Sequence, residues 1–436
     1  MKRVVTYLFG WILLLGLAAC AKSEEEPAPS PGFIPWGYSY SYYSYCPLLM
    51  SRATLEQSVA ALPARPMHNT GKIYRLGRFL FINEQYEGIH VIDNQDPEHP
   101  QLISFLRVPG NVDMAVKGNL LYVDNGPDLV SIDISNPQAV RTVGRVRNAF
   151  RELPMPTNFG ITPACLPENR PANTVVVGWQ KIKNDAPIVD PRLAWVRMSV
   201  LNYASTTSSQ PPTSSSDAAT GKAGSLARFA ILGQTLYTVD ENSLRLFDLL
   251  DPANPTAKEQ VSLVPGIETI YPKDHYLFLG TQRGMYIFDV ATPQSPKQVS
   301  YYQHVVSCDP VVVDDRYAYV TLRSGQTCGG GPNQLQVIDL TNLSKPQLAR
   351  TYSMSSPQGL GIDNNLLFVC DGDGLKIFDA SQAPVLTQKQ VFPIKVVDVI
   401  PDQGTLMAIG ADGLYQYSYT GTQLRQLSLL PITPAN

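Results

Sequence analysis

Short apolar runs, broken by Gly, Asn, Asp and Pro, recur along the chain from about Gly71 onward. The runs are rich in Val, Ile, Leu, Phe and Tyr, which favour β-strands. Many of them end in an apolar residue followed by Asp, as in EGIHVID and GMYIFD. The aspartates that close these runs are Asp93, Asp133, Asp248, Asp289, Asp339 and Asp379. The pattern predicts an all-β protein built from repeated units.

The spacing of these aspartates gives the period of the repeat. The gaps between them are 40, 115, 41, 50 and 40 residues, and a degenerate unit places Ser418 39 residues after Asp379. The two long gaps are one period plus an insertion. Each period contains four short strand patterns, and four strands in about 40 residues are the signature of a β-propeller blade. We therefore predict a seven-bladed β-propeller of four-stranded blades with one long inter-blade insertion.

The units also resemble a known family. EGIHVIDNQDPEHP and SLRLFDLLDPANP are similar to the LVIVD-repeat family of bacterial β-propellers, in which an apolar run ends in Asp and a D-P-x-x-P turn follows. The resemblance covers about residues 71–430 apart from the insertion, and it implies a seven-bladed ring. It implies little about activity, because propellers host many functions.

The recurring aspartates have a physical explanation that needs no ligand. An Asp at a strand end can accept hydrogen bonds from backbone amides two or three residues further on, and a following Pro blocks further strand pairing. We therefore interpret them as structural corners. The same structural explanation applies to the stretch VCDGDGLKIFD, whose spaced carboxylates resemble a calcium loop. Aligned on the repeats, it separates into a hairpin turn at Asp371 and Asp373 and a strand-end corner at Asp379, so no metal site is predicted.

The N-terminal residues predict export and lipidation. Lys2 and Arg3 precede an apolar run, Val4–Leu17, which is shorter than the roughly 20 residues that a spanning helix needs. This pattern is typical of a signal peptide. The next residues, LAAC, resemble the bacterial lipobox, whose cysteine receives the lipid and becomes the first residue of the mature chain. We therefore assign residues 1–19 to the signal peptide and lipidation to Cys20; an ordinary secretory signal with a chance cysteine is the alternative.

A tether and an arm are expected to follow. Residues 20–35 are charged and Pro-rich, as in an extended linker. Their acidic stretch KSEEE resembles the export signal of Bacteroidota surface lipoproteins, and a solvated linker is the alternative. We predict attachment to the bacterial outer membrane through the lipid on Cys20, on the periplasmic side or at the cell surface, with the surface slightly favoured. Residues 36–70, which begin with alternating Tyr and Ser, should form an extended N-terminal arm.

The propeller is expected to span residues 71–430, with a tail at 431–436. The loops that join blades share one face with the turns between second and third strands, and we call this the top face. The insertion, residues 147–224, joins blades two and three and should lie on the top face, as a partner-binding or capping element or with no role. It contains a possible hairpin, TVVVGWQ with LAWVRMSVLNY, and the low-complexity stretch STTSSQPPTSSSDAATGKAG. We expect residues 205–221 to be dispensable for folding.

Five cysteines lie beyond the lipobox, and exported proteins commonly form disulfides. Cys308 and Cys328 both fall on the top side of blade five, which suggests a disulfide between them. Cys46 and Cys165 lie in irregular segments and could form a second bridge. Cys370 would then be a free core thiol or the partner of Cys308 or Cys328. The odd number leaves at least one cysteine unpaired within the monomer.

Polar residues begin the innermost strands at comparable places. Their side chains could ring the upper end of the central channel, where they could either pair with one another or bind a small polar ligand. Further candidates lie in loops and turns of the same face. The candidate ligand-binding residues are Asp113, Arg228, Glu268, Asp309, Arg323, Asp371 and Asp398, with His304 and Gln358 beside them.

Familiar catalytic motifs are absent from the sequence. It contains no HExxH, no CxxC pair, no G-x-S-x-G elbow and no phosphate loop. The net charge of −3 and the scattered basic residues argue against nucleic acid as a partner. We predict a monomeric, non-enzymatic binding or scaffold module for an envelope or extracellular protein or glycan, without cofactor or metal. The alternatives are a hydrolase or lyase acting on extracellular carbohydrate at the channel mouth, and a purely structural envelope protein.

Overall fold

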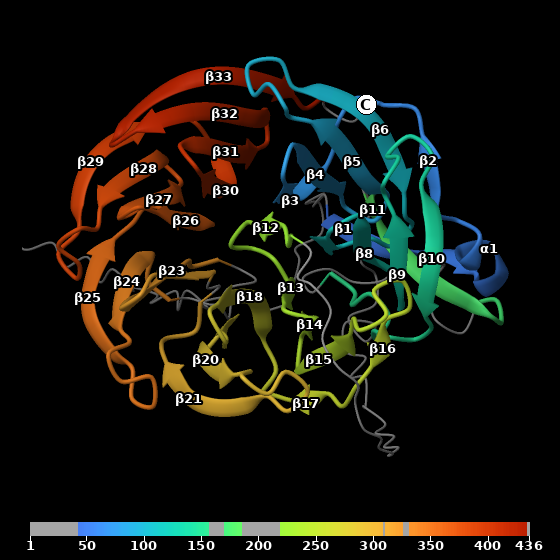
Figure 1. Cartoon of the computed structure of the whole chain (residues 1–436), viewed down its shortest axis with the longest axis horizontal. Helices are drawn as coiled ribbons and strands as arrows, with labels where there is room; N and C mark the ends of the chain where they lie inside the picture. Colours follow the sequence, from blue (N-terminus) through green and yellow to red (C-terminus); the bar gives the residue numbers. More distant parts are fainter. Residues whose placement is uncertain (1–41, 157–169, 185–218, 308–309, 326–330, 434–436) are drawn as a thin grey trace, which may run out of the picture. The chain divides into compact units, whose positions relative to one another are not determined.

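The computed structural model describes residues 42–156, 170–184, 219–307, 310–325 and 331–433. Within these residues the chain folds into seven antiparallel sheets arranged as the blades of a ring, which Figure 1 shows face on. The helix α1 (Arg52–Glu56) is a single short turn. No helix in the described part of the chain has the length and apolar character needed to cross a membrane. The predicted all-β, seven-bladed β-propeller is confirmed.

Each blade is an antiparallel sheet of consecutive strands, ordered from the channel outwards. Blade one consists of β3 (Thr70–Leu76), β4 (Phe79–Glu84), β5 (Gly88–Asp93) and β6 (Gln101–Arg107). Blade two consists of β7 (Met114–Lys117), β8 (Leu120–Asn125), β9 (Asp128–Asp133) and β10 (Arg141–Val146). Blade three consists of β13 (Phe229–Leu232), β14 (Thr235–Asp240) and β15 (Ser243–Asp248), with β16 (Thr256–Ala257) and β17 (Val261–Ser262) sharing the outermost place.

Blades four to seven follow the same order. Blade four consists of β18 (Ile267–Lys273), β19 (Tyr276–Thr281), β20 (Gly284–Asp289) and β21 (Lys297–Gln303), and blade five of β22 (Val311–Val313), β23 (Tyr317–Leu322), β24 (Gln334–Asp339) and β25 (Gln347–Ser353). Blade six consists of β26 (Leu360–Asp363), β27 (Leu366–Asp371), β28 (Gly374–Asp379) and β29 (Thr387–Phe392). Blade seven consists of β30 (Val396–Asp402), β31 (Thr405–Gly410), β32 (Gly413–Thr420) and β33 (Gln423–Pro431).

The second and third strands of the blades form the buried middle of the propeller. In β5 every residue except Asp93 is buried, because neighbouring elements cover both faces of the sheet. At one blade boundary, Tyr319 and Val337 of blade five share a hydrophobic cluster with Leu360 and Leu367 of blade six. Burial of both faces explains why these strands have nearly continuous apolar runs rather than strict alternation.

The strand-end aspartates act as corners, as their interpretation from sequence predicted. One carboxylate oxygen of each accepts the backbone N–H of the residue two positions further on, at 2.7–3.0 Å. In blade two, hydrogen bonds from the Ser135 hydroxyl and backbone N–H, with the Arg141 side chain, lower the pKa of Asp133 to about 2. The six donors are Gln95, Ser135, Leu250, Ala291, Thr341 and Ser381.

The turn after each aspartate also joins neighbouring blades. A backbone carbonyl of the turn accepts a hydrogen bond from a Ser or Tyr hydroxyl of the preceding blade, at 2.6–2.9 Å. We call this bond the inter-blade clip. The donor and acceptor pairs are Ser104 and Pro137, Tyr122 and Pro252, Tyr237 and Pro293, Ser300 and Leu343, Tyr352 and Pro384, and Ser428 and Pro97.

Blade seven departs from this scheme. Its corresponding turn has Ser418 in place of the aspartate and contains no proline. At the boundary between blades six and seven, the Tyr419 hydroxyl instead donates to the carboxylate of Asp363. The degenerate seventh repeat therefore coincides with a different connection between its blade and the preceding one.

The two ends of the propeller meet where the ring closes. Met67, just before blade one, forms a parallel bridge with Ile432, just after blade seven. The Thr433 N–H donates to the Met67 carbonyl at 2.9 Å, and Nδ1 of His68 lies 2.7 Å from the Thr433 carbonyl. On the outer edge, Arg425 pairs with Glu98 at 2.9 Å. Side-chain and backbone bonds therefore close the ring without a blade that mixes strands from both chain ends.

The N-terminal arm and the insertion together cover part of the top face. β1 (Tyr42–Ser51) pairs with β11 (Thr174–Asn184), and β2 (Ala60–Leu62) adds to the outer edge of β6. We call β1, α1, β2 and β11 the clasp. A side chain at Gly110 would come within 2.6 Å of the Gly126 nitrogen and 3.4 Å of the Val177 Cα, so glycine lets β11 approach the turns of blades one and two. The other half of the hairpin predicted in the insertion, LAWVRMSVLNY, lies outside the described residues.

Candidate functional site

The central channel contains a segment of the protein's own chain, residues 219–228, which we call the channel segment. At the bottom end, the Gly118 N–H donates to the Ala219 carbonyl at 2.8 Å. The segment then runs antiparallel to β3 as β12 (Lys222–Ala223), which lies inside the ring in Figure 1. It reaches the top face at Arg228. The expectation that the insertion lies on the top face is wrong for residues 219–224, because this end of the insertion enters the channel and adds β12 to the inner edge of β3.

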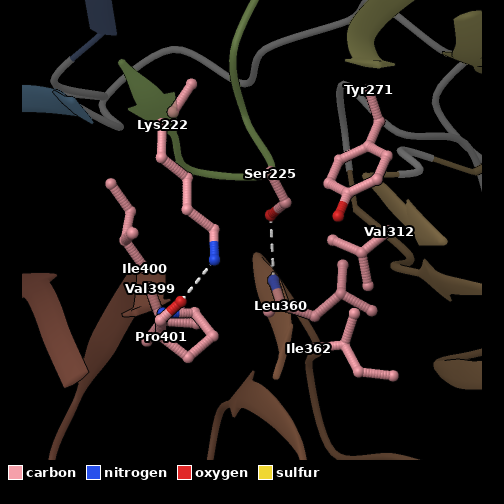
Figure 2. A pocket seen from close by; sticks show the side chains of 11 residues that line it. Lys222, Ser225, Tyr271, Val312, Leu360, Ile362, Val399, Ile400 and Pro401 are labelled. Carbon is pink, nitrogen blue, oxygen red and sulfur yellow. Dashed lines mark hydrogen bonds between the residues drawn. The ribbon is translucent and has the colours of Figure 1, made fainter. Parts of the chain in front are cut away.

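Near its upper end, the channel segment is held between blades six and seven. The Ser225 N–H and hydroxyl donate to Oδ1 of Asp398 at 3.1 and 3.0 Å, and Oγ of Ser225 accepts the Leu360 N–H at 2.9 Å. Lower down, Lys222 donates to the Pro401 carbonyl at 2.6 Å; Figure 2 shows this bond and the one to Leu360. The cavity beside them has a volume of about 10 Å³, room for about one water molecule. This cavity is too small for a substrate.

Asp398 anchors the channel segment from beneath the protein surface. Its side chain is buried, and burial raises the pKa of its carboxyl to about 6, although hydrogen bonds from Ser225 and nearby backbone amides favour the charged form. The second oxygen, Oδ2, has no hydrogen-bond partner within the described chain. It lies against Gly224, where any side chain would collide with the carboxylate.

A second buried cluster lies on the blade-two side of the channel. Lys72 Nζ is 2.5 Å from Oδ2 of Asp113, which also accepts the backbone N–H of Arg228. Asp124 accepts hydrogen bonds from the Asn111 side chain and from two backbone N–H groups at 2.8–3.1 Å. Burial and the neighbouring Asp113 charge raise the pKa of Asp124 to about 7, and burial lowers the pKa of Lys72.

The predicted ring of polar residues is divided by these contacts. Arg228 Nε donates to the backbone carbonyl of Glu268 at 3.3 Å, and Oε1 of Glu268 accepts from the Gln282 side chain at 3.1 Å. Asp113, Arg228 and Glu268 are therefore connected along blades two to four. Asp398 lies apart from them, beneath the channel segment. Asp309 lies outside the described residues.

Asp371 is held at the top of blade six. Lys376 Nζ lies 2.6 Å from its carboxylate and 3.0 Å from that of Asp373. Burial opposes ionisation of Asp371, but Lys376 and backbone N–H groups hold its pKa below the usual value. Asp379 lies at the opposite end of β28, so the interpretation of this stretch as two separate turns is confirmed.

The remaining candidates lie on separate loops of the top face. The half-buried Arg323 accepts the Ser307 hydroxyl at its backbone carbonyl, at 3.0 Å. Nδ1 of His304 lies 2.6 Å from the Val305 carbonyl. Gln358 donates its backbone N–H within blade six at 2.8 Å. These contacts hold each residue to nearby loops and strands.

The predicted cysteine pairs stay predictions. Cys165, Cys308 and Cys328 lie outside the described residues, as does the lipidation site Cys20. Cys46 lies in β1 and is not a free thiol. Cys370, one of the two outcomes left open by the sequence, is free and buried in β27, and burial raises its pKa.

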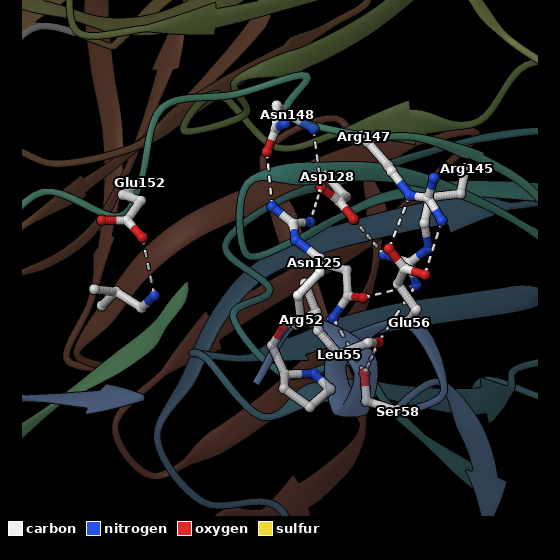
Figure 3. A network of polar contacts seen from close by, with 12 residues as sticks. Arg52, Leu55, Glu56, Ser58, Asn125, Asp128, Arg145, Arg147, Asn148 and Glu152 are labelled. Carbon is white, nitrogen blue, oxygen red and sulfur yellow. Dashed lines mark hydrogen bonds and ion pairs between the residues drawn. The ribbon is translucent and has the colours of Figure 1, made fainter. Parts of the chain in front are cut away.

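Sequence reasoning missed a polar network that fastens the clasp to blade two. The carboxylate of Asp128 is buried, with one oxygen 2.6 Å from Arg52 and the other 2.7 Å from Arg145 (Figure 3). Arg147 forms a two-point pair with Glu56 of α1 at 2.8 and 2.9 Å. Arg52 and Asp128 are 76 residues apart, so no local motif marks the pair. The one available signal is the repeated arginine, Arg145 and Arg147, at the end of an outer strand.

The described site residues mainly serve structure. Most of the carboxylates around the channel are paired with cations or backbone amides. Across the described ranges, no three His, Cys, Asp or Glu side chains are grouped so that they could hold a metal ion. The two carboxyls with raised pKa values, Asp124 and Asp398, are only 8% and 1% exposed. The polar side chains that a large partner could reach therefore lie mainly on the loops of the top and bottom faces.

The seven blades, their order and their corner turns define the class of protein as a seven-bladed β-propeller. The family model of the LVIVD repeat matches residues 110–148, which include blade two, and residues 307–354, which include blade five. The chain therefore carries LVIVD repeats, as its sequence predicted.

Solved structures with the same fold include the periplasmic gluconolactonase PpgL of Pseudomonas aeruginosa. The identity is 11% with a TM-score of 0.52, over 83% of this chain and 96% of that one. A functionally unknown protein from Desulfotomaculum acetoxidans matches at 10% identity with a TM-score of 0.51, over 82% of this chain and 98% of that one. At these identities the likeness shows the fold alone. No curated protein matches the chain in sequence.

Proposed function

We propose that the protein is a monomeric, exported lipoprotein of the bacterial outer membrane whose propeller is a binding or scaffold module. The signal-like N-terminus and LAAC support anchoring through Cys20. Between that cysteine and β1 lie residues 20–41, and these 22 residues reach at most about 75 Å when extended. The propeller would thus be held near the membrane while keeping rotational freedom. Surface exposure is favoured over a periplasmic position.

The observation that carries the proposal is the channel segment. The space in which a ring of blades could hold a small substrate is occupied by residues 219–228, held by hydrogen bonds to six of the blades. What remains is a rigid ring with loops of unequal length, a form that suits recognition of an envelope or extracellular protein or glycan. The predicted disulfides Cys308–Cys328 and Cys46–Cys165 belong to the same proposal, because they would stiffen an exported chain.

The anchor is tested by fractionating cells that produce the wild-type protein or Cys20→Ala. We expect the wild type in membranes with an acylated Cys20 in the mass spectrum of its N-terminal peptide, and the variant released. Retention of the Cys20→Ala protein in membranes would count against lipidation. Protease added to whole cells then separates the surface position from the periplasmic one.

The binding role is tested with a photo-crosslinking amino acid at Arg283 on the top face, Leu250 on the bottom face or Leu348 on the outer edge, all exposed. We expect a discrete envelope protein or glycan adduct from at least one position. The absence of an adduct from every position would favour the structural alternative.

The hydrolase or lyase alternative is based on the raised pKa values of Asp124 and Asp398. Turnover of envelope carbohydrate that is lost in Asp124→Asn or Asp398→Asn would favour it.

A further inference from the structure

Several of the exposed apolar side chains lie on the top face, while Leu250, Val385 and Leu348 elsewhere on the propeller are exposed to a similar degree. Leu48 belongs to β1 of the clasp, Val264 to the loop that enters blade four, and Val305 and Val306 to the loop that enters blade five. Val391 lies near the top end of β29. Their exposed fractions are 45%, 55%, 50%, 41% and 42%, in that order.

One of these residues has a buried counterpart in the same ring. Val108–Gly110 and Val264–Gly266 are both V-P-G turns, and in each the glycine N–H donates to the tip of the adjacent turn, to Tyr86 at 2.8 Å and to Glu241 at 2.7 Å. Val108 is fully buried in a cluster against which Val59 and Ala61 pack, beside the clasp. The equivalent Val264 is bare. The valine of this turn is therefore buried where apolar residues of the chain lie over it, and exposed where none of the described residues do.

The exposed residues are distributed around the ring rather than gathered in a groove. They come from the clasp over blades one and two, from the loops that enter blades four and five, and from the outer strand of blade six, all at the same end of the strands. A protein partner typically covers a compact patch of about 800 Å². Single apolar tips spread over one face fit a partner that is itself broad, flat and apolar. A lipid bilayer has these properties.

The described chain begins on this face. β1 is the first described strand, and as part of the clasp it lies over the top of blades one and two. Residues 20–41 join it to the lipidation site. A short tether keeps the groups nearest to its attachment point at high local concentration at the membrane. The clasp on the top face is therefore the described part of the propeller that is nearest in sequence to the anchor.

We propose that the top face contacts the membrane, with Val264, Val305, Val306, Val391 and Leu48 entering the outer part of the bilayer. This inference rests on the proposed lipid anchor and names lipid as the partner of that face. The bottom face and the outer edge are then left for other partners.

Charge plays a minor part in this contact. Exposed groups of both signs, Arg283 and Lys395 with Asp373 and Asp412, occur in the turns and loops of the same face. Their opposite signs leave apolar burial as the main attraction. Salt, which screens exposed charges, should therefore change the contact little.

The test places one tryptophan at a time in the lipidated full-length protein. Val264→Trp and Val305→Trp probe the top face; Leu250→Trp and Val385→Trp, at side chains 38% and 47% exposed, are matched controls at bottom-face turns. Each variant is reconstituted in phosphatidylethanolamine–phosphatidylglycerol vesicles with or without brominated acyl chains, and wild-type emission is subtracted. We expect bromine to quench the added emission of the top-face variants and to leave the controls unchanged. Equal quenching on both faces, or quenching of the controls alone, would overturn the proposal.

A second measurement removes the anchor. In the Cys20→Ala protein, the triple change Val264→Ser, Val305→Ser and Val306→Ser should lower vesicle partition roughly tenfold, since three exposed valines lose their apolar burial. The matched change Leu250→Ser, Leu348→Ser and Val385→Ser should have no effect. Added salt should leave the difference unchanged.

These results separate the anchor from the face. Acylated Cys20 without top-face quenching overturns the membrane contact and leaves the anchor intact. Top-face quenching in a chain without acylation supports the contact and rejects the anchor. Cross-linking of Arg283 to a protein, without lipid quenching of Val264→Trp or Val305→Trp, would make this face a protein-docking surface and overturn the proposal.

Discussion

Asn94 of blade one and Gln416 of blade seven exchange two hydrogen bonds across the boundary where the ring closes. The Asn94 side chain donates to Gln416 at 2.9 Å, and the Gln416 side chain donates to Asn94 at 2.7 Å. Both residues are buried. Each amide satisfies the other, so a pair of side chains separated by 322 residues connects the first and last blades.

Gln416→Leu should lower the free energy of unfolding by about 1–3 kcal/mol, because the buried Asn94 amide loses its partner. The double variant with Asn94→Leu should lose less than the sum of the two single changes. Urea denaturation monitored by fluorescence measures both. Gln426→Leu, at an exposed position of the same blade, is the control and should change stability by less than about 0.5 kcal/mol. Additive losses would contradict the coupling.

The inter-blade clip can be tested at Tyr122, whose hydroxyl donates to the Pro252 carbonyl at 2.8 Å. Tyr122→Phe keeps the ring and removes this bond, so it should cost about 1 kcal/mol of folding free energy in the same assay. Tyr286→Phe is the matched control, since its buried ring forms no hydroxyl hydrogen bond within the described part of the chain. An equal effect of the two changes would mean that the clip contributes nothing.

Asp124→Asn should stabilise the protein at neutral and alkaline pH. Burial, and to a smaller extent the Asp113 charge, raises the folded pKa of Asp124 from 3.8 to about 7, against the opposing effects of backbone hydrogen bonds and of Lys72. The folded state therefore keeps a proton that the unfolded chain has released, and this group makes stability fall as pH rises from about 4 to 7. The variant keeps the accepting oxygen without the charge, so its curve should be flatter, with a gain of about 1–3 kcal/mol at pH 8.

Calorimetric melting temperatures between pH 4.5 and 8.5 would measure this difference. Asp128→Asn should change stability in the opposite direction. Hydrogen bonds and ion pairs outweigh burial at Asp128 and hold the pKa of its carboxyl below the usual value. This variant should lose stability at neutral pH, and the loss should shrink as pH falls. A loss of stability in Asp124→Asn across the whole range would show that the folded protein relies on the charged carboxylate.

The channel segment changes the expected effect of deleting residues 205–221, which the sequence predicted to be dispensable for folding. Removing residues 205–216 should leave the melting temperature unchanged, because this stretch has low complexity. Extending the deletion to Gly221 removes the bonds from Gly118 to Ala219 and from Gly221 to Val116. It should cost about 1–3 kcal/mol. Thermal melts of the two deletions decide the point, and identical curves would show that the lower end of the segment contributes no stability.

The blades and their corners could be predicted because the signals are local. Asp93 and its donor Gln95 are two residues apart, and the same spacing recurs in six blades. The contact of Asp113 with Arg228 was also within reach, since both residues begin innermost strands. Ser225 and Asp398 are 173 residues apart, and nothing in TGKAGS marks a strand that adds to β3. Lys72 was missed because its charge becomes significant only when Asp113 lies beside it.

The channel segment also has a consequence for the order of assembly. Ser225 precedes by 135 and 173 residues the groups that hold it, Leu360 and Asp398. Placing the segment inside a finished ring would require a loop to be threaded through it, which natural folds avoid. Blades six and seven must therefore assemble around a strand that is already in place. The end of the insertion is then part of the surface on which the last two blades assemble, and a chain that stopped before blade six would leave it uncovered.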